Sequence, residues 1–223
     1  MPTVLITGCD SGLGREFALQ YAQAGYTVWA TYRDVQNALP AQPGMCNCAL
    51  DVTDMAQFAA LKVALGDTPI DVLVSNAGIG QDIAALQDLD IAYVQRMLAT
   101  NTVGPLKLVQ TLVDNVAASA QRRIVFVGSR MGSITLNLSG GHYGYRASKA
   151  ALNAIGRSLA IDLFQRGITL AMVHPGSVRT DGGNPQAPLS ATQSVQAMRA
   201  TIAQMGNHET GIFCTYNGQP LPW

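Results

Sequence analysis

The sequence predicts an α/β protein built on a single doubly wound parallel sheet of about seven strands flanked by helices. Short apolar runs rich in β-branched residues alternate with longer segments of helical periodicity, which is the pattern of repeated strand–helix–strand units. The chain is 48% hydrophobic and only 13% charged, as expected when a parallel sheet is buried on both faces. Its 223 residues suffice for one domain, which we place at residues 1–223.

The predicted elements follow one another in regular order. Strands are expected near residues 3–7, 26–31, 46–50, 70–75, 123–128, 168–174 and 211–215. Helices are expected near residues 13–24, 54–65, 91–118, 144–165 and 190–205. A short loop rich in glycine and proline, at about 181–194, follows the sixth strand on the side where such sheets bind ligands.

The first predicted strand runs directly into a glycine-rich loop that opens a helix. Such a unit binds the diphosphate of a dinucleotide at the helix N-terminus, where free N–H groups and the helix dipole favour anions. The Gly-x3-Gly-x-Gly spacing differs from the common Rossmann fingerprint, so an ordinary glycine-rich turn is the alternative. The loop favours a Rossmann-type sheet whose cofactor contacts are Gly8, Asp10, Ser11, Gly12, Leu13 and Gly14.

Tyr145 and Lys149 lie four residues apart on one predicted helix and therefore on one helical face. A lysine ammonium beside a phenol can lower the pKa of the phenol and make it a usable proton donor and acceptor. Alone, the pair also fits a surface lysine beside a half-buried tyrosine.

Together the glycine loop and the Tyr145/Lys149 pair resemble the short-chain dehydrogenase/reductase family. Further motifs stand in the order of that family: Asn76-Ala77-Gly78, Asn101, Ser129 and Pro175-Gly176-x-Val178-x-Thr180. Within the family, the stretches 130–134 and 143–149 are similar to small carbonyl reductases of the sniffer and C-factor kind. The resemblance implies that the loop at about 181–194 borders the substrate.

The resemblance also implies four catalytic residues. Tyr145 would exchange a proton with the substrate oxygen, Ser129 would hydrogen-bond that oxygen, and Lys149 would tune Tyr145 and bind the nicotinamide ribose. Asn101 would anchor a water molecule that links Lys149 to solvent. Ser133 competes with Ser129, because Ser129 lies sixteen and Ser133 twelve residues before Tyr145, and the family's usual spacing falls between. We prefer Ser129, which directly follows a predicted strand.

The expected cofactor is NADP(H), with NAD(H) as the alternative. An NAD enzyme of this family carries an acid at the end of the second strand, where this chain has Tyr32 followed by Arg33. A guanidinium suits a 2′-phosphate, whereas Asp10 in the glycine loop would repel one. Asp51 could accept a hydrogen bond from the adenine amino group or could instead cap the next helix. The remaining cofactor contacts implied are Val52, Asn76, Ala77, Gly78, Tyr145, Lys149, Pro175, Gly176, Val178 and Thr180.

These patterns predict an oxidoreductase that transfers a hydride between NADP(H) and a small carbonyl compound or secondary alcohol, most simply a carbonyl reductase. The alternative is a nicotinamide-binding signalling or redox-sensing protein of the C-factor type. The substrate itself and the direction of the reaction are not specified by the sequence.

Composition argues against several other classes. Zero net charge and the lack of a basic run argue against a nucleic-acid partner, and no apolar run approaches the roughly 20 residues of a membrane helix. The cysteine spacing predicts no metal site. The first strand begins at Thr3, which leaves no room for a signal peptide, so we expect a cytoplasmic protein. The apolar helices near 91–118 and 144–165 suggest, by resemblance, a homodimer or homotetramer; alternatively they face only their own sheet.

Overall fold

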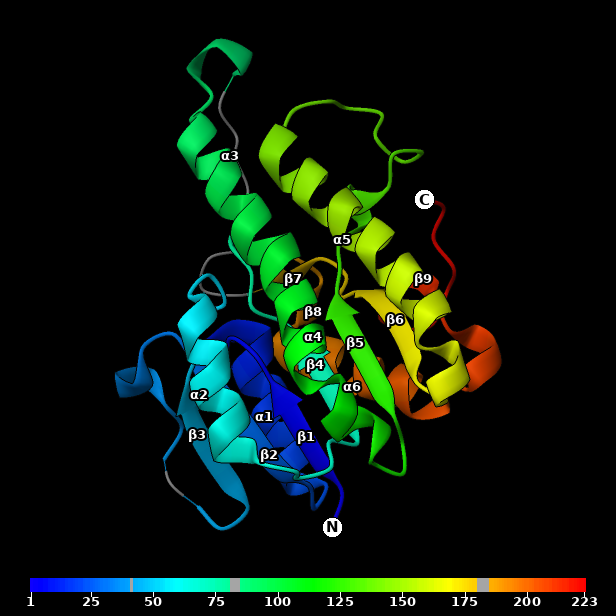
Figure 1. Cartoon of the computed structure of the whole chain (residues 1–223). Coiled ribbons are helices and arrows are strands. Elements are labelled where there is room, and N and C mark those ends of the chain that lie inside the picture. The colour runs from blue at the N-terminus through cyan, green and yellow to red at the C-terminus, as the bar shows by residue number, and fades with distance from the viewer. Residues whose placement is uncertain (41, 81–84, 180–184) are drawn as a thin grey trace.

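Seven strands pair in parallel into one sheet in the order β3-β2-β1-β4-β5-β6-β9. The computed structural model describes residues 1–40, 42–80, 85–179 and 185–223 (Figure 1). The strands are β1 Thr3–Ile6, β2 Thr27–Tyr32, β3 Met45–Ala49, β4 Val72–Ser75, β5 Arg123–Val127, β6 Thr169–His174 and β9 Ile212–Thr215. The strand order reverses between β1 and β4, which confirms the predicted doubly wound, Rossmann-type sheet.

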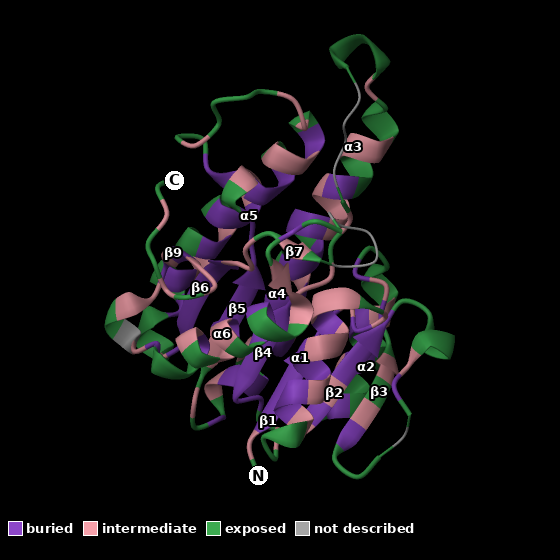
Figure 2. Ribbon diagram, turned by 180° about the vertical axis from the view of Figure 1, so that it is seen from behind, coloured by how far each residue is buried: buried purple, intermediate pink, exposed green. Residues whose placement is uncertain are grey.

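Helices cover both faces of this sheet (Figures 1 and 2). One layer contains α1 Gly12–Gln23 and α6 Ala191–Gln204, and the other contains α2 Met55–Leu65, α4 Gly104–Ala117 and α5 Tyr143–Asp162. Side chains alternate between the layers along each strand, so that Val4 and Ile6 join one apolar cluster and Leu5 joins the other. No helix in the described part of the chain has the length and apolar composition that crossing a bilayer requires.

The helix predicted at 91–118 is not continuous. It is divided into α3 Ile91–Leu98, a π-helical segment Ala99–Val103 and α4. The π segment contains Asn101, whose fully buried side chain is hydrogen-bonded to the backbone of Ile79 beyond the end of β4. A wider π turn is commonly found where a helix must present a residue to a functional site, and helical periodicity alone does not reveal it.

The segment after β6 differs in detail from the predicted loop at about 181–194. Two residues on each side of it pair in parallel as β7 Val178–Arg179 and β8 Leu189–Ser190. The loop ends earlier than predicted, because the Ser190 hydroxyl accepts a hydrogen bond from Gln193 N and caps α6. Thr180 and residues 181–184 lie outside the described residues, so their predicted roles stay predictions.

Candidate active site

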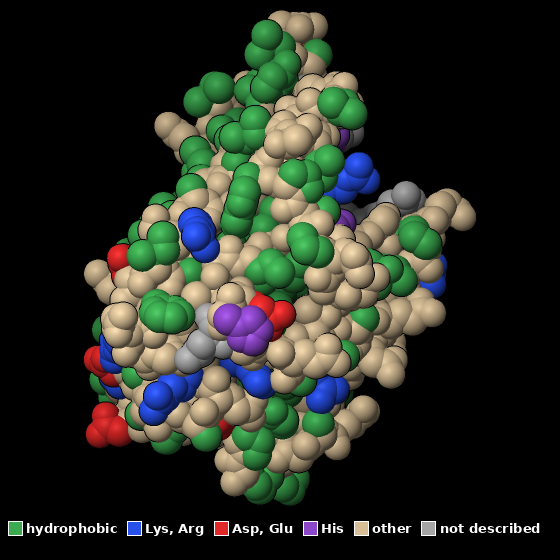
Figure 3. Space-filling model, turned by 90° about the vertical axis from the view of Figure 1, so that its right-hand side faces the viewer, with side chains coloured by type: hydrophobic (Ala, Val, Ile, Leu, Met, Phe, Trp, Pro, Cys, Tyr) green, Lys and Arg blue, Asp and Glu red, His purple; other side chains and the backbone are tan. Residues whose placement is uncertain are grey.

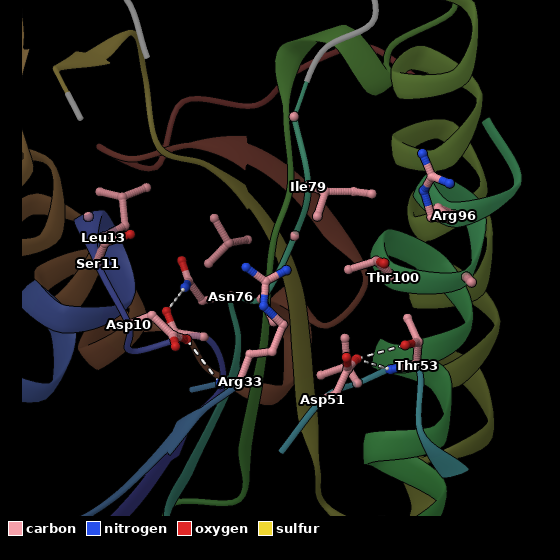
Figure 4. Close-up of a pocket in the computed structure, with 18 of the residues that line it drawn as sticks. Asp10, Ser11, Leu13, Arg33, Asp51, Thr53, Asn76, Ile79, Arg96 and Thr100 are labelled. Atoms are coloured by element: carbon pink, nitrogen blue, oxygen red, sulfur yellow. Dashed lines mark hydrogen bonds between the residues drawn. The ribbon is translucent and has the colours of Figure 1, made fainter. Parts of the chain in front are cut away.

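A cleft of about 800 Å³ opens along the carboxyl ends of the parallel strands (Figure 4). This edge, next to the reversal of strand order, is where doubly wound sheets bind ligands. Segments that follow β1 to β6 contribute to it, together with α3, the π segment and α5. It is lined by Gly8, Asp10, Ser11, Gly12, Leu13, Arg33, Leu50, Asp51, Val52, Thr53, Asn76, Ala77, Gly78, Ile79, Gly80, Tyr93, Arg96, Ala99, Thr100, Val127, Gly128, Tyr145, Lys149 and Pro175.

The glycine loop is held in place by close packing against the segment after β4. A Cβ added to Gly14 would lie 2.0 Å from the carbonyl oxygen of Gly8 and 2.5 Å from Nδ2 of Asn76, so only glycine fits. Asn76 Nδ2 donates to the carbonyls of Thr7 at 3.0 Å and Gly8 at 3.1 Å. The N-cap residue of α1, Ser11, makes no side-chain cap hydrogen bond, which leaves the first amides of this helix suited to an anionic diphosphate.

Asp10 and Arg33 meet at the end of β2. The Asp10 carboxylate accepts hydrogen bonds from the backbone N–H groups of Arg33 at 3.2 Å and Asp34 at 3.0 Å. The Arg33 guanidinium extends into the cleft (Figure 4). Two amides therefore partly satisfy the negative charge of Asp10, while the positive charge of Arg33 stays exposed to a ligand.

Asp51 is not the cap of the next helix. The N-cap of α2 is Asp54, whose side chain accepts from Ala56 N at 2.9 Å. Asp51 Oδ1 instead accepts from the amide and the hydroxyl of Thr53, at 2.8 and 2.7 Å. This local turn holds the Asp51 carboxylate at the wall of the cleft.

Tyr145, Lys149 and Ser129 come together at the other end of the cleft. The Lys149 ammonium lies 5.9 Å from the centre of the Tyr145 ring and donates to the carbonyl oxygen of Val127 at 3.0 Å. The Ser129 hydroxyl is hydrogen-bonded to the Tyr145 phenol. Helix α5 and the end of β5 thus bring three polar side chains to one point, as the sequence motifs require.

Burial dominates the ionisation of this group. It raises the pKa of the Tyr145 phenol above its ordinary value of 10.0, and the hydrogen bond with Ser129 opposes this rise. It lowers the pKa of the Lys149 ammonium to about 8. The Lys149 ammonium lies 5.9 Å from the centre of the Tyr145 ring, and the lowering of the Tyr145 pKa by this charge stays a prediction.

The structure separates the two competing serines. Ser133 is 1% exposed, and its hydroxyl donates to the main-chain oxygen of Trp223 at 3.0 Å and accepts from Leu136 N at 3.1 Å. It makes backbone contacts within its own loop and with the C-terminal segment. Ser129, rather than Ser133, faces Tyr145.

Asn101 lies behind the cleft wall. Its two Nδ2 hydrogens are engaged by the carbonyl of Ile79 at 3.1 Å and the hydroxyl of Ser148 at 3.0 Å, and its Oδ1 accepts from Ile79 N at 2.9 Å. A carbonyl oxygen has two lone pairs, so Oδ1 is the atom with capacity for one further partner. The predicted role of Asn101 in holding a water molecule stays a prediction.

Most of the predicted site residues line the cleft, and some do not. Gly14, Asn101, Ser129, Gly176 and Val178 lie outside its lining, and Thr180 lies outside the described residues. Several lining side chains were not predicted from the sequence: Thr53, Ile79, Tyr93, Arg96 and Thr100. Thr100 directly precedes Asn101 and could have been found from that motif. The position of α3, which carries Arg96, depends on the π segment and had no sequence signal.

A Rossmann-type sheet with a glycine loop at one end of its cleft and a Ser–Tyr–Lys group at the other defines a dinucleotide-dependent oxidoreductase. The family model of the short chain dehydrogenases matches residues 2–188. The chain therefore belongs to this family of nicotinamide-dependent enzymes.

Individual relatives agree with that assignment. The C-signal protein of Myxococcus xanthus is 41% identical over 155 residues, which cover 70% of this chain and 93% of that protein. The carbonyl reductase Sniffer of D. melanogaster is 29% identical with a TM-score of 0.91, and both chains are covered completely. The NADPH-bound carbonyl reductase from chicken fatty liver is 27% identical with a TM-score of 0.90, covering 100% of this chain and 94% of that one. The resemblance to sniffer-like and C-factor-like proteins is confirmed.

Proposed function

We propose that the protein is an NADP(H)-dependent carbonyl reductase that acts on small carbonyl compounds and, in reverse, on secondary alcohols. The observation that carries this proposal is the hydrogen bond between Ser129 and Tyr145 beside the buried Lys149 ammonium. A group of this kind can hold a substrate oxygen in place and give it a proton. The carbonyl reductases among the structural neighbours support the same substrate class.

The roles of the side chains follow from their ionisation. A bound nicotinamide supplies or accepts the hydride. The ordinary pKa of a tyrosine phenol, 10.0, already leaves it protonated at neutral pH, and burial raises the pKa of Tyr145 further, so its phenol can donate to a carbonyl oxygen. Ser129 donates a hydrogen bond to the same oxygen and holds it close to the phenol. Lys149, with a pKa of about 8, remains largely charged at neutral pH and stabilises the phenolate that is left.

The cofactor preference depends on Arg33 and Asp10. The guanidinium of Arg33 enters the cleft, where it can bind a 2′-phosphate, while the charge of Asp10 is partly satisfied by two backbone amides. This arrangement, and the NADPH found in the chicken reductase, support NADP(H). NAD(H) is the alternative, with Asp10 accepting a hydrogen bond from a free 2′-hydroxyl. With either cofactor, Asp51 at the cleft wall is the acceptor for the adenine amino group.

The test is turnover on a panel of reactive aldehydes, diketones and secondary alcohols, with NADPH and NADH side by side. We expect a preference for NADPH and a loss of about 10²- to 10⁴-fold in kcat for Tyr145→Phe. Cofactor affinity, measured by fluorescence titration, should be retained in this variant because the phenol hydroxyl serves the substrate. Unchanged turnover in Tyr145→Phe would contradict the mechanism, and a preference for NADH would transfer the selecting role to Asp10.

A second candidate function is signalling, which the similarity to the C-signal protein favours. A cofactor-binding signal or redox sensor needs the glycine loop but does not need the Tyr145 hydroxyl. Tight cofactor binding, no turnover on the panel and a cellular phenotype that is complemented by Tyr145→Phe would support this candidate over the reductase.

We also infer that the protein forms a homodimer, with a homotetramer as the alternative. An apolar groove of about 390 Å³ lies between α2, α4 and α5, and Val103 and Leu106 on its wall are exposed. Val109 and Leu112 of the same segment are buried in the protein's own core. Leu106→Glu should shift the mass measured by light scattering to that of the monomer. Val63→Glu, at an exposed position on α2 outside the groove, is the matched control.

A further inference from the structure

We propose that Trp223 is a positioning residue for the reaction: its main-chain oxygen and indole ring support the loop that connects Ser129 to Tyr145. The inference rests on the proposed function, since it concerns the alignment of the two hydroxyls assigned to catalysis. Trp223 does not line the cleft and would act through the loop.

The inner side of the turn after Ser129 is fixed to α5. Ser129 Oγ accepts from Met131 N at 3.1 Å, and the carbonyl of Ser129 accepts from Gly132 N at 2.9 Å. A Cβ on Gly132 would lie 2.8 Å from the backbone carbonyl of Lys149, and Asn153 Nδ2 donates to the carbonyl of Gly132 at 3.3 Å. The turn therefore rests directly on the helix that carries Tyr145 and Lys149.

The outer side of the turn is held by the C-terminal segment. The main-chain oxygen of Trp223 accepts two hydrogen bonds, from Ser133 Oγ at 3.0 Å and from Thr135 N at 2.9 Å. The Trp223 ring stacks on Phe213 of β9, with centroids 5.6 Å apart and planes inclined by 26°. Trp223 thus ties the loop to the last strand of the sheet, across 90 residues of sequence.

Apart from Trp223, the middle of the loop is held by Arg146 of α5, which donates to Ser139 Oγ at 3.0 Å and to the carbonyl oxygen of Gly141 at 3.2 Å. Ile134 and Leu138 are 79% and 93% exposed. Gly140, Gly141 and His142 follow with φ of +64°, +64° and +51°, so the chain turns sharply before α5. Figure 3, which faces the side where the C-terminus lies, shows apolar side chains gathered over the upper part of this surface.

The two ends of this loop carry the two hydroxyls that must meet at one substrate oxygen. Ser129 stands at its beginning, and Tyr145 lies in the first turn of the helix at its end. A displacement of about 1 Å at a reacting group can cost on the order of 10²-fold in rate. Removing the contacts that Trp223 makes with the loop and with Phe213 should therefore lower kcat while leaving the cofactor site intact.

The test compares steady-state reduction by Trp223→Ala, Trp223→Phe and Ser133→Ala. We expect Trp223→Ala and Ser133→Ala to lower kcat about 10-fold, with the Kd for NADPH unchanged because neither residue lines the cleft. Trp223→Phe should recover most of kcat, since a phenyl ring can still stack on Phe213. The matched control is Trp29→Ala, which removes the chain's other tryptophan, partly buried in β2 and distant from the loop. An unchanged kcat in Trp223→Ala, or an equal loss in Trp29→Ala, would overturn the proposal.

A spectroscopic readout separates this inference from the proposed function. The chain has two tryptophans, so in a Trp29→Phe background Trp223 is the sole tryptophan, and its emission is followed by exciting at a wavelength that tyrosine does not absorb. Adding Ser133→Ala should shift its emission to the red and speed hydrogen exchange at the amides of Thr135 and Leu136. The absence of both changes would overturn the proposed positioning role of Trp223 even if the enzyme is active. Lack of turnover in the parent protein as well as in every variant, with both changes present, would overturn the reductase proposal instead.

Discussion

The two ends of the cleft are held in different ways. At one end, Ser129 and Lys149 are buried, and the Lys149 ammonium donates to the carbonyl oxygen of the buried residue Val127. At the other end, Arg33 is exposed, and Asp10 is hydrogen-bonded to the exposed backbone at the end of β2. We call these the buried end and the exposed end. Burial shifts the pKa values of Tyr145 and Lys149, and the proton transfer that we propose takes place at the buried end.

The comparison suggests that the two ends of the cleft have different functions. Preorganised polar groups act most strongly where water is excluded, because the local dielectric is low. Charges in contact with water are screened, yet they can still discriminate ligands that differ by a whole phosphate group. Substitutions at the buried end should therefore change turnover, and substitutions at the exposed end should change the choice of cofactor.

The largest effect is expected at the buried end. Ser129→Ala should lower kcat by about 10²- to 10³-fold, since it removes a hydrogen-bond donor to the substrate oxygen in a site from which water is excluded. Steady-state reduction with NADPH measures this loss, and the Kd for NADPH should stay the same. The alternative assignment predicts a different result: if Ser133→Ala caused the larger loss of the two, Ser133 would be the catalytic serine.

An intermediate effect is expected at the exposed end. Arg33→Ala should weaken NADPH binding by about 10- to 100-fold, the range expected for lost hydrogen bonds to a charged group. The Kd for NADH should change little, because it lacks the 2′-phosphate. Titration of both cofactors at low and high salt measures the difference, which salt should reduce. Arg96→Ala is the control, since Arg96 also lines the cleft but lies 3.7 Å from the Asp90 carboxylate. Equal losses of affinity for NADPH and NADH would contradict the assignment of cofactor choice to Arg33 at the exposed end.

The smallest effect concerns stability. The pKa of Lys149 is about 8 in the folded protein and 10.5 in its ordinary environment. Between these values the unfolded chain binds more protons than the folded one, so the free energy of unfolding should rise with pH. The slope contributed by one group is at most about 1.4 kcal/mol per pH unit.

Lys149→Met should lack this contribution. Urea unfolding of the parent and the variant across this pH range measures it. The buried thiols of Cys9 and Cys214 have raised pKa values and act in the opposite direction, so the informative quantity is the difference between the two proteins. A difference that does not vary with pH would show that Lys149 is not desolvated in the folded state.

Much of this architecture could be predicted from the sequence because it depends on local patterns. Alternating apolar runs and helical periodicity placed all seven strands of the main sheet within one or two residues of their ends. The spacing of Tyr145 and Lys149 puts both on one face of α5 whatever lies around it. The glycine loop could be identified because strand, turn and helix are consecutive in the chain, and Gly14 has no alternative residue at that approach.

Other features were decided only when the elements packed together. The choice between Ser129 and Ser133 depends on contacts with Tyr145 and with Trp223. The π segment at Asn101 depends on hydrogen bonds to Ile79, and the ionisation of Tyr145 depends on burial. By itself, the sequence determined which residues share a strand, a turn or a helical face, because those relations are set by backbone periodicity. Tertiary structure alone decided which polar groups come into contact and how far they are buried from water. Contact and desolvation arise between segments that are far apart in the chain.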